Sequence, residues 1–163
     1  MTAHAHDDRC THPSQEVILH GVSESVRRYG WHCVGVFDDP GTGSPQFAYT
    51  IGLHKSWKHP ELVIVGLPPE GGHHILSRAV EQISDYRRHY HDGERVAGLL
   101  PDSYEVLFQK VHLAYAAIPF GISDAWYEEP VPRLQVLWPD TENRLPHQLD
   151  CDQSVRAAQD IYA

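Results

Sequence analysis

Apolar residues recur at helical spacing near the start of the chain. Ile18, Val22 and Val26 fall four residues apart, so one face of a helix would bury all three. Ser14 is a suitable N-cap, and Gly30 is a natural residue for a helix to end on. The pattern predicts a helix over residues 14–29.

Beyond Gly30 the pattern changes to the two-residue period of β-strands. Residues 31–39 and 46–53 alternate around the turn sequence "DDPGTGSP", which predicts an antiparallel hairpin. The run "PELVIVGL", residues 60–67, is continuously apolar after its first two residues, as expected of a third strand that is covered on both faces. Helical periodicity returns afterwards and predicts a longer helix over residues 72–89.

Strand-like segments dominate the second half of the chain. They are "RVAGLL", "EVLFQKV", "LAYAAIPF" and "RLQVLWPD", and the prolines among them exclude long helices. The final stretch, "SVRAAQDIYA", is predicted to form a short helix or to fray. Together the patterns predict an α+β fold with a mainly antiparallel sheet, an N-terminal helix and one longer helix following the third strand.

Length and composition favour one globular domain. The chain has 163 residues, of which 41% are hydrophobic and 21% charged, and a chain of this kind can form a single core. Residues 1–12 lack periodicity, so we expect a mobile N-terminal arm at 1–12 and a single globular domain over residues 13–163.

The balance of charge argues against two classes of partner. The formal net charge is −9 and the basic residues are dispersed, so the sequence does not predict nucleic-acid binding. The longest apolar run, Leu62 to Pro69, is too short to span a membrane, and no signal peptide is recognisable. Three separated cysteines indicate reduced thiols. We therefore expect a cytoplasmic protein whose partner is a small molecule or another protein, and the sequence leaves its oligomeric state open.

Histidine is the unusual feature of the composition, with 13 copies. His54, His59 and Glu61 fall in or beside the connection between the second and third predicted strands, and imidazole and carboxylate groups are suitable ligands for a divalent metal ion. These three residues are the candidate metal ligands and catalytic groups, with activation of a bound water as the expected chemistry. The H-x4-H spacing matches no established metal motif, so the alternative is a structural loop whose polar groups are simply paired.

A second group of candidates surrounds the start of the longer predicted helix. Gly71 and Gly72 could let an anion approach the helix N-terminus, with His73 in the first turn. Trp31, Tyr49 and Trp57 would form the apolar wall of this ligand pocket, and Thr50 lies on the small-residue face of the second strand. The alternative is that the glycine pair only relieves a tight turn.

Asp140 follows the last clear strand, in the sequence "WPD". A carboxylate in this position could act as a general base or orient a histidine. The alternative is an Asx-type turn after the proline.

Several of these segments resemble a bacterial family catalogued as domain of unknown function 4262. The resemblance rests on Tyr29-Gly30-Trp31, "FAYTIGLH" at 47–54, "HPEL" at 59–62 and "LQVLWPD" at 134–140, and it extends from about Tyr29 to Pro146. It implies the domain boundary and no particular reaction.

Two alternative functions stay open from the sequence, as does the question of whether the protein is an enzyme. The first is a non-enzymatic, acidic protein-interaction domain, with Trp57, Trp126 and Tyr127 exposed to anchor a basic partner. The second is binding of a flavin or nucleotide on a sheet like that of the split barrels, which rests on element order alone. A divalent metal is the cofactor that the histidine loop favours, and a flavin is the less favoured one.

Overall fold

The computed structural model describes residues 13–162, so the predicted arm at 1–12 lies outside the described residues. Six strands within this range form one mixed sheet in the order β1-β2-β3-β6-β5-β4. The strands are β1 (His32–Val36), β2 (Phe47–Ile51), β3 (Glu61–Val65), β4 (Arg95–Ala97), β5 (Glu105–Lys110) and β6 (Arg133–Leu137). All neighbouring pairs are antiparallel except β3 and β6. The predicted α+β class with a mainly antiparallel sheet is therefore confirmed.

The same residues contain five helices. These are α1 (Gln15–Tyr29), α2 (Leu53–Trp57), α3 (Pro69–Tyr86), α4 (Gly121–Tyr127) and α5 (Gln153–Ala158). Three elements differ from the sequence patterns. The connection after β2 contains the one-turn helix α2 instead of a plain loop, residues 113–120 form no strand, and the short helix α4 was not predicted. A five-residue helix is too short to produce a recognisable helical period.

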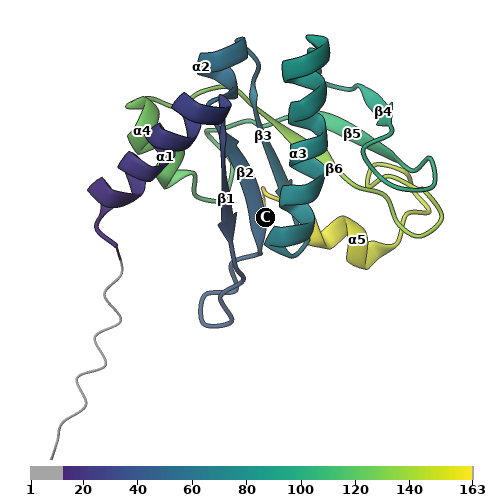
Figure 1. The fold of residues 1–163 in the computed structure, drawn as a ribbon. Helices are drawn as coiled ribbons and strands as arrows, with labels where there is room; N and C mark the ends of the chain where they lie inside the picture. Colours follow the sequence, from purple (N-terminus) through teal and green to yellow (C-terminus); the bar gives the residue numbers. More distant parts are fainter. Residues whose placement is uncertain (1–12, 163) are drawn as a thin grey trace, which may run out of the picture.

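The helices cover both faces of the sheet, and Figure 1 shows α3 crossing one side of β1 to β3 while α1 and α4 lie together. One core includes Ile75, Leu76 and Ile83 of α3, packed with Leu62 and Ile64 of the sheet. A second core joins α1 to the other face. Strand β3 is buried at every position, which explains its continuous apolar sequence.

The junction between α1 and α2 depends on close packing at two glycines. Gly30 ends α1 with φ +87, and a Cβ there would lie 2.4 Å from the Trp57 ring. Gly52 precedes α2 with φ +114, and its Cβ would lie 2.7 Å from the Gly30 carbonyl oxygen. Both positions combine a left-handed backbone with a lack of space, so a glycine is required at each.

No helix within residues 13–162 is both long enough and apolar enough to cross a membrane.

Candidate functional site

Glu61 begins β3 and is fully buried. Its Oε1 accepts hydrogen bonds from the backbone N–H of Gly52 at 2.8 Å and of His54 at 3.1 Å, and from the Tyr127 hydroxyl. Its Oε2 accepts from the Thr50 hydroxyl at 2.6 Å. The Thr50 oxygen in turn accepts from the Leu62 N–H at 2.9 Å, so this hydroxyl is both a donor and an acceptor. The carboxylate thus holds the end of β2, the start of α2 and the end of α4 in one place.

The electrostatic setting of Glu61 contains two opposed effects. Burial raises the pKa of Glu61, because desolvation disfavours the charged form, while the hydrogen bonds from Thr50, Tyr127, His54 and Gly52 act to lower it. All four partners donate, which is the pairing that an ionised carboxylate requires.

His59 is also fully buried and has both ring nitrogens engaged. Nε2 accepts a hydrogen bond from the Tyr90 backbone N–H at 2.9 Å. Nδ1 must therefore carry the proton, which it donates to the Pro60 carbonyl oxygen at 2.7 Å. Burial lowers the pKa of His59 to about 4, so the ring is neutral near pH 7.

His54 lies on α2 with its side chain half-buried, and its ring meets the Tyr127 ring edge-on at 6.1 Å between centroids. It contacts Glu61 through its backbone N–H. Among residues 13–162, no group of three or more His, Cys, Asp or Glu side chains is arranged to hold a metal ion. The structure therefore gives no support to the metal-activated water predicted for His54, His59 and Glu61, which stays an untested prediction.

Three of the residues that were predicted to form a ligand pocket have other structural roles. Tyr49 is buried in the second core, where its ring meets Phe120 edge-on at 5.5 Å. Thr50 is buried beside Glu61, and Trp57 covers Gly30. The spacing of these residues along the chain gave no sign that strand β2 is followed directly by helix α2 at Gly52.

Two more of the predicted pocket residues, Trp31 and His73, lie beside each other. They line a cavity of about 630 Å³ between the end of α1, the exposed side of β1 and the start of α3. We call it the β1–α3 pocket; its lining includes Tyr29, Trp31, Cys33, Phe37, Glu70 and His73. The Trp31 and His73 rings are 5.9 Å apart between centroids. Residues 42 positions apart in sequence are thus joined at one surface.

The polar side chains that line this pocket include two imidazoles, the Glu70 carboxylate, the Ser25 hydroxyl and the Cys33 thiol. His32 also lines it, and burial together with the charge of a protonated His73 lowers the pKa of His32. Burial raises the pKa of the Cys33 thiol to about 12, so the reactive thiolate form is suppressed there. In the part of the chain that the structure describes, neither lysine nor arginine contributes to the lining.

Gly71 and Gly72 have different surroundings in the first turn of α3. A Cβ on Gly72 would lie 2.9 Å from Ile64 Cγ2, whereas a Cβ on Gly71 would meet nothing within 4 Å. The Gly72 N–H donates to the Pro68 carbonyl at 3.0 Å, and Pro69 has no N–H. Gly72 therefore serves the close packing of α3 on the sheet, and few amides are left for the predicted anion.

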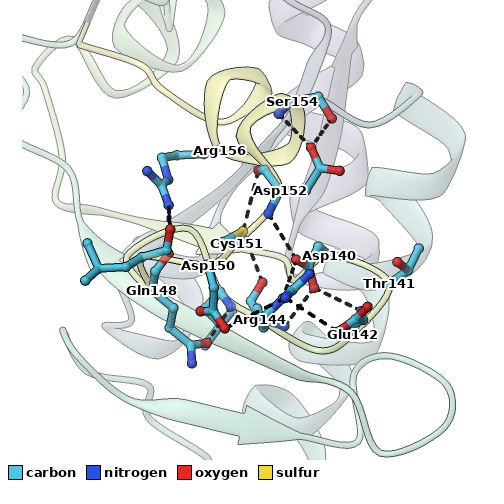
Figure 2. A network of polar contacts seen from close by, with 12 residues as sticks. Asp140, Thr141, Glu142, Arg144, Gln148, Asp150, Cys151, Asp152, Ser154 and Arg156 are labelled. Carbon is cyan, nitrogen blue, oxygen red and sulfur yellow. Dashed lines mark hydrogen bonds and ion pairs between the residues drawn. The ribbon is translucent and has the colours of Figure 1, made fainter.

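Asp140 organises a turn, as Figure 2 shows. Its Oδ1 accepts from the N–H groups of Glu142 at 2.9 Å and Arg144 at 3.0 Å. Its Oδ2 accepts from Arg144 Nε at 2.9 Å and from the Asp152 N–H at 3.0 Å. Burial alone would raise the pKa of Asp140, but these backbone donors and the Arg144 guanidinium outweigh it and lower the pKa to about 2. The alternative of an Asx-type turn describes this contact pattern, and no histidine is among its hydrogen-bond partners within residues 13–162.

Sequence reasoning missed the buried Arg133 of β6. It pairs in parallel register with Glu61, and its guanidinium lies 4.1 Å from the centre of the Phe120 ring. The same group donates to Ser123 Oγ at 2.6 Å and to Asp124 Oδ1 at 3.3 Å. An arginine at the start of the mostly apolar strand segment "RLQVL" was the one available signal.

The aromatic residues expected as exposed anchors are half-buried instead. Trp126 donates to Ser23 Oγ at 3.0 Å, and the Lys55 ammonium lies 5.4 Å from its ring centre. Tyr127 is bound to Glu61. These side chains stabilise the contact between α1, α2 and α4, so the expectation of their exposure was wrong.

Comparison with protein families matches residues 25–152 to the family described as Domain of unknown function (DUF4262). The chain belongs to this family. No curated protein and no solved structure matches it. Within the DUF4262 match, the segments that carried the resemblance have identifiable structural roles: Gly30 ends α1, Thr50 and Gly52 bind Glu61, and His59 joins Pro60 to Tyr90.

Proposed function

We propose that this DUF4262 protein binds a small organic ligand in the β1–α3 pocket. The observation that carries the proposal is the convergence of Trp31 and His73 on one cavity of about 630 Å³. That volume falls within the roughly 300–1,000 Å³ of ordinary ligand pockets. The proposal keeps the start of α3 as the site and replaces the β2–β3 connection with β1 as the opposite wall.

The lining favours a ligand with an apolar, flat body and a cationic or hydrogen-bond-donating end. Tyr29, Trp31 and Phe37 offer aromatic surface, and tyrosine and tryptophan rings also attract cations. Among residues 13–162, Glu70 is the one carboxylate of the lining and no lysine or arginine is part of it, while the Arg28 guanidinium lies 5.3 Å from the centre of the Tyr29 ring at the pocket edge. An amine therefore fits this site better than a phosphate, which disfavours a flavin nucleotide here.

A charge-matched pair of probes tests the proposal. Phenethylamine and 3-phenylpropionate have similar aromatic bodies and opposite charges, and each would be titrated at constant ionic strength while backbone amide NMR signals are recorded. We expect saturable shifts at Trp31, Cys33 and His73, with tighter binding of the amine. Glu70→Gln should remove the preference, whereas Glu81→Gln, an exposed change elsewhere on α3, should leave it intact.

Two results would contradict the proposal: shifts spread evenly over the surface, or equal binding of both probes that Glu70→Gln does not alter. Either result would favour the protein-interaction alternative.

We keep the cytoplasm as the proposed location, because Cys33 and Cys151 are free thiols and reduced thiols suit that compartment.

A further inference from the structure

A second hollow lies at the opposite end of α3, where α2 also ends. We call this cavity of about 340 Å³ the α2–α3 pocket; its lining includes Trp57, Lys58, Ile83, Arg87, Arg88 and His89. Within residues 13–162 it shares no lining residue with the β1–α3 pocket, and its Trp57 packs against Gly30, which lies between Tyr29 and Trp31 of that pocket. The two cavities are distinct sites.

Among the described residues, 13–162, every ionisable group that lines the α2–α3 pocket is basic. Lys58, Arg87, Arg88 and His89 contribute to it and no carboxylate of this range does, although the whole chain has a net charge of −9. Such a concentration of one sign in a hollow attracts ions of the opposite sign.

Two of the three permanent cations are available to a ligand. Arg88 pairs with Glu94 and lies 5.3 Å from the centre of the Tyr90 ring. Lys58 and Arg87, by contrast, form no ion pair and no side-chain hydrogen bond with other residues of the 13–162 range. Their donors are thus free to bind an anion.

The backbone places these two cations at matching positions. Lys58 is the C-cap of α2 with φ +55, and Arg87 is the C-cap of α3 with φ +58. A cation near a helix C-terminus complements the helix dipole, which accounts for either residue alone. It does not account for both helix ends delivering their cations, with Arg88 and His89, to one hollow.

We propose that the α2–α3 pocket binds a phosphate group, carried by a small organic molecule. Lys58 and Arg87 supply charge-assisted donors, and the guanidinium fork matches the several oxygens of a phosphate. The Trp57 ring provides apolar surface for the organic part. This inference is independent of the β1–α3 ligand and concerns ligands of the opposite charge.

The test uses inorganic phosphate and phenyl phosphate, titrated at constant ionic strength and followed by amide NMR shifts. We expect saturable binding of both at residues 56–58 and 87–89, with phenyl phosphate tighter because its ring can contact Trp57. Lys58→Asn and Arg87→Asn each remove one charge, and asparagine tolerates the left-handed backbone of these positions. Each should weaken phosphate binding about tenfold, the loss expected for one charge-assisted hydrogen bond.

Arg78→Gln is the matched control, because it removes one exposed positive charge from α3 outside the pocket and should leave the affinity unchanged. Arg87→Gly provides a second variant if an asparagine variant fails to fold. The proposal is overturned if neither probe binds saturably, or if Arg78→Gln weakens binding as much as the pocket variants do. The second result would show a diffuse surface field instead of a site.

Discussion

His59 and Glu61 have side chains of the kind that bind metal ions, yet in the fold their polar atoms are committed to internal partners. The ring of His59 joins two backbone groups, and the carboxylate of Glu61 has four donors. Residue type and spacing predicted that this segment is chemically unusual. They could not reveal partners such as Tyr127, which is 66 positions from Glu61.

His59 should make the stability of the protein depend on pH. Its folded-state pKa is about 4, below the ordinary 6.5, so the unfolded chain binds a proton more readily between these values. The contribution of the neutral ring is therefore fully present above pH 6.5 and is lost as the pH falls toward 4. We expect the wild type to lose on the order of 2 kcal/mol of unfolding free energy through this group across that window.

The measurement is urea unfolding of the wild type and His59→Gln at pH 7 and pH 4.5. Glutamine can offer a donor and an acceptor but does not titrate, so the variant should be somewhat less stable at pH 7 and should lose less on acidification. Equal losses in the two proteins would show that His59 is not the titrating group.

Replacing Glu61 should cost stability in proportion to the donors left unpaired. Glu61→Ala removes the acceptor for four groups, of which the Gly52 N–H keeps the Tyr127 hydroxyl as an acceptor at 3.1 Å; each buried unpaired group costs roughly 1–3 kcal/mol, so we expect a loss of about 3 kcal/mol or more. Tyr127→Phe removes one donor to Glu61 and a second acceptor of the Gly52 N–H, which stays bonded to Glu61, and should cost about 1 kcal/mol. Denaturant unfolding at pH 7 measures both changes. A Glu61→Ala variant as stable as Tyr127→Phe would contradict the anchoring role.

At the scale of elements, regular periodicity was informative and short or bent segments were not. The pattern at Val22 and Val26 predicted a helix over residues 14–29, where α1 occupies Gln15–Tyr29. Helix α2 escaped prediction because five residues show no period and because its position depends on Gly52 and on the distant Glu61. For the same reason the sequence could not show that Trp31 and His73 meet at one cavity while Tyr49 is buried in the second core.

The end of α1 should tolerate no side chain at its glycine. Gly30→Ala places a Cβ against Trp57 at a positive φ, and we expect a loss of about 2 kcal/mol or more from strain and displaced packing. Gly21 provides the control, since it lies within α1 and its Cβ would meet nothing within 4 Å. Gly21→Ala should stabilise the protein by roughly 0.5–1 kcal/mol. Thermal unfolding compares the two, and effects of the same sign would contradict the packing argument.

At the scale of the whole molecule, the C-terminal segment that follows β6, residues 138–162, contacts parts of the fold that are distant in sequence. Gln159 accepts from the Trp138 N–H and donates to the Trp138 carbonyl, and the Ile161 carbonyl accepts from the Ala117 N–H at 2.6 Å. Ile161 is buried in the second core. The family match ends at residue 152, but residues beyond it complete the fold. Asp140 holds the turn near the start of this C-terminal segment (Figure 2).

Loss of the Asp140 charge should therefore weaken the packing of the C-terminal segment against the rest of the fold. In Asp140→Asn one carboxylate oxygen becomes an amide N–H₂ that faces donors, so the bonds from Arg144 or Asp152 are lost, and we expect a lower unfolding temperature at pH 7. The pKa of Asp140 is about 2 against an ordinary 3.8, so its stabilisation is present above pH 3.8 and disappears as the pH falls toward 2. The difference between wild type and variant should thus shrink across that interval. Glu142→Gln removes a charge from the same turn, where Glu142 is mostly exposed, and should change little. If Glu142→Gln lowered the unfolding temperature as much as Asp140→Asn, the charge of the turn and not its hydrogen bonds would hold the C-terminal segment in place.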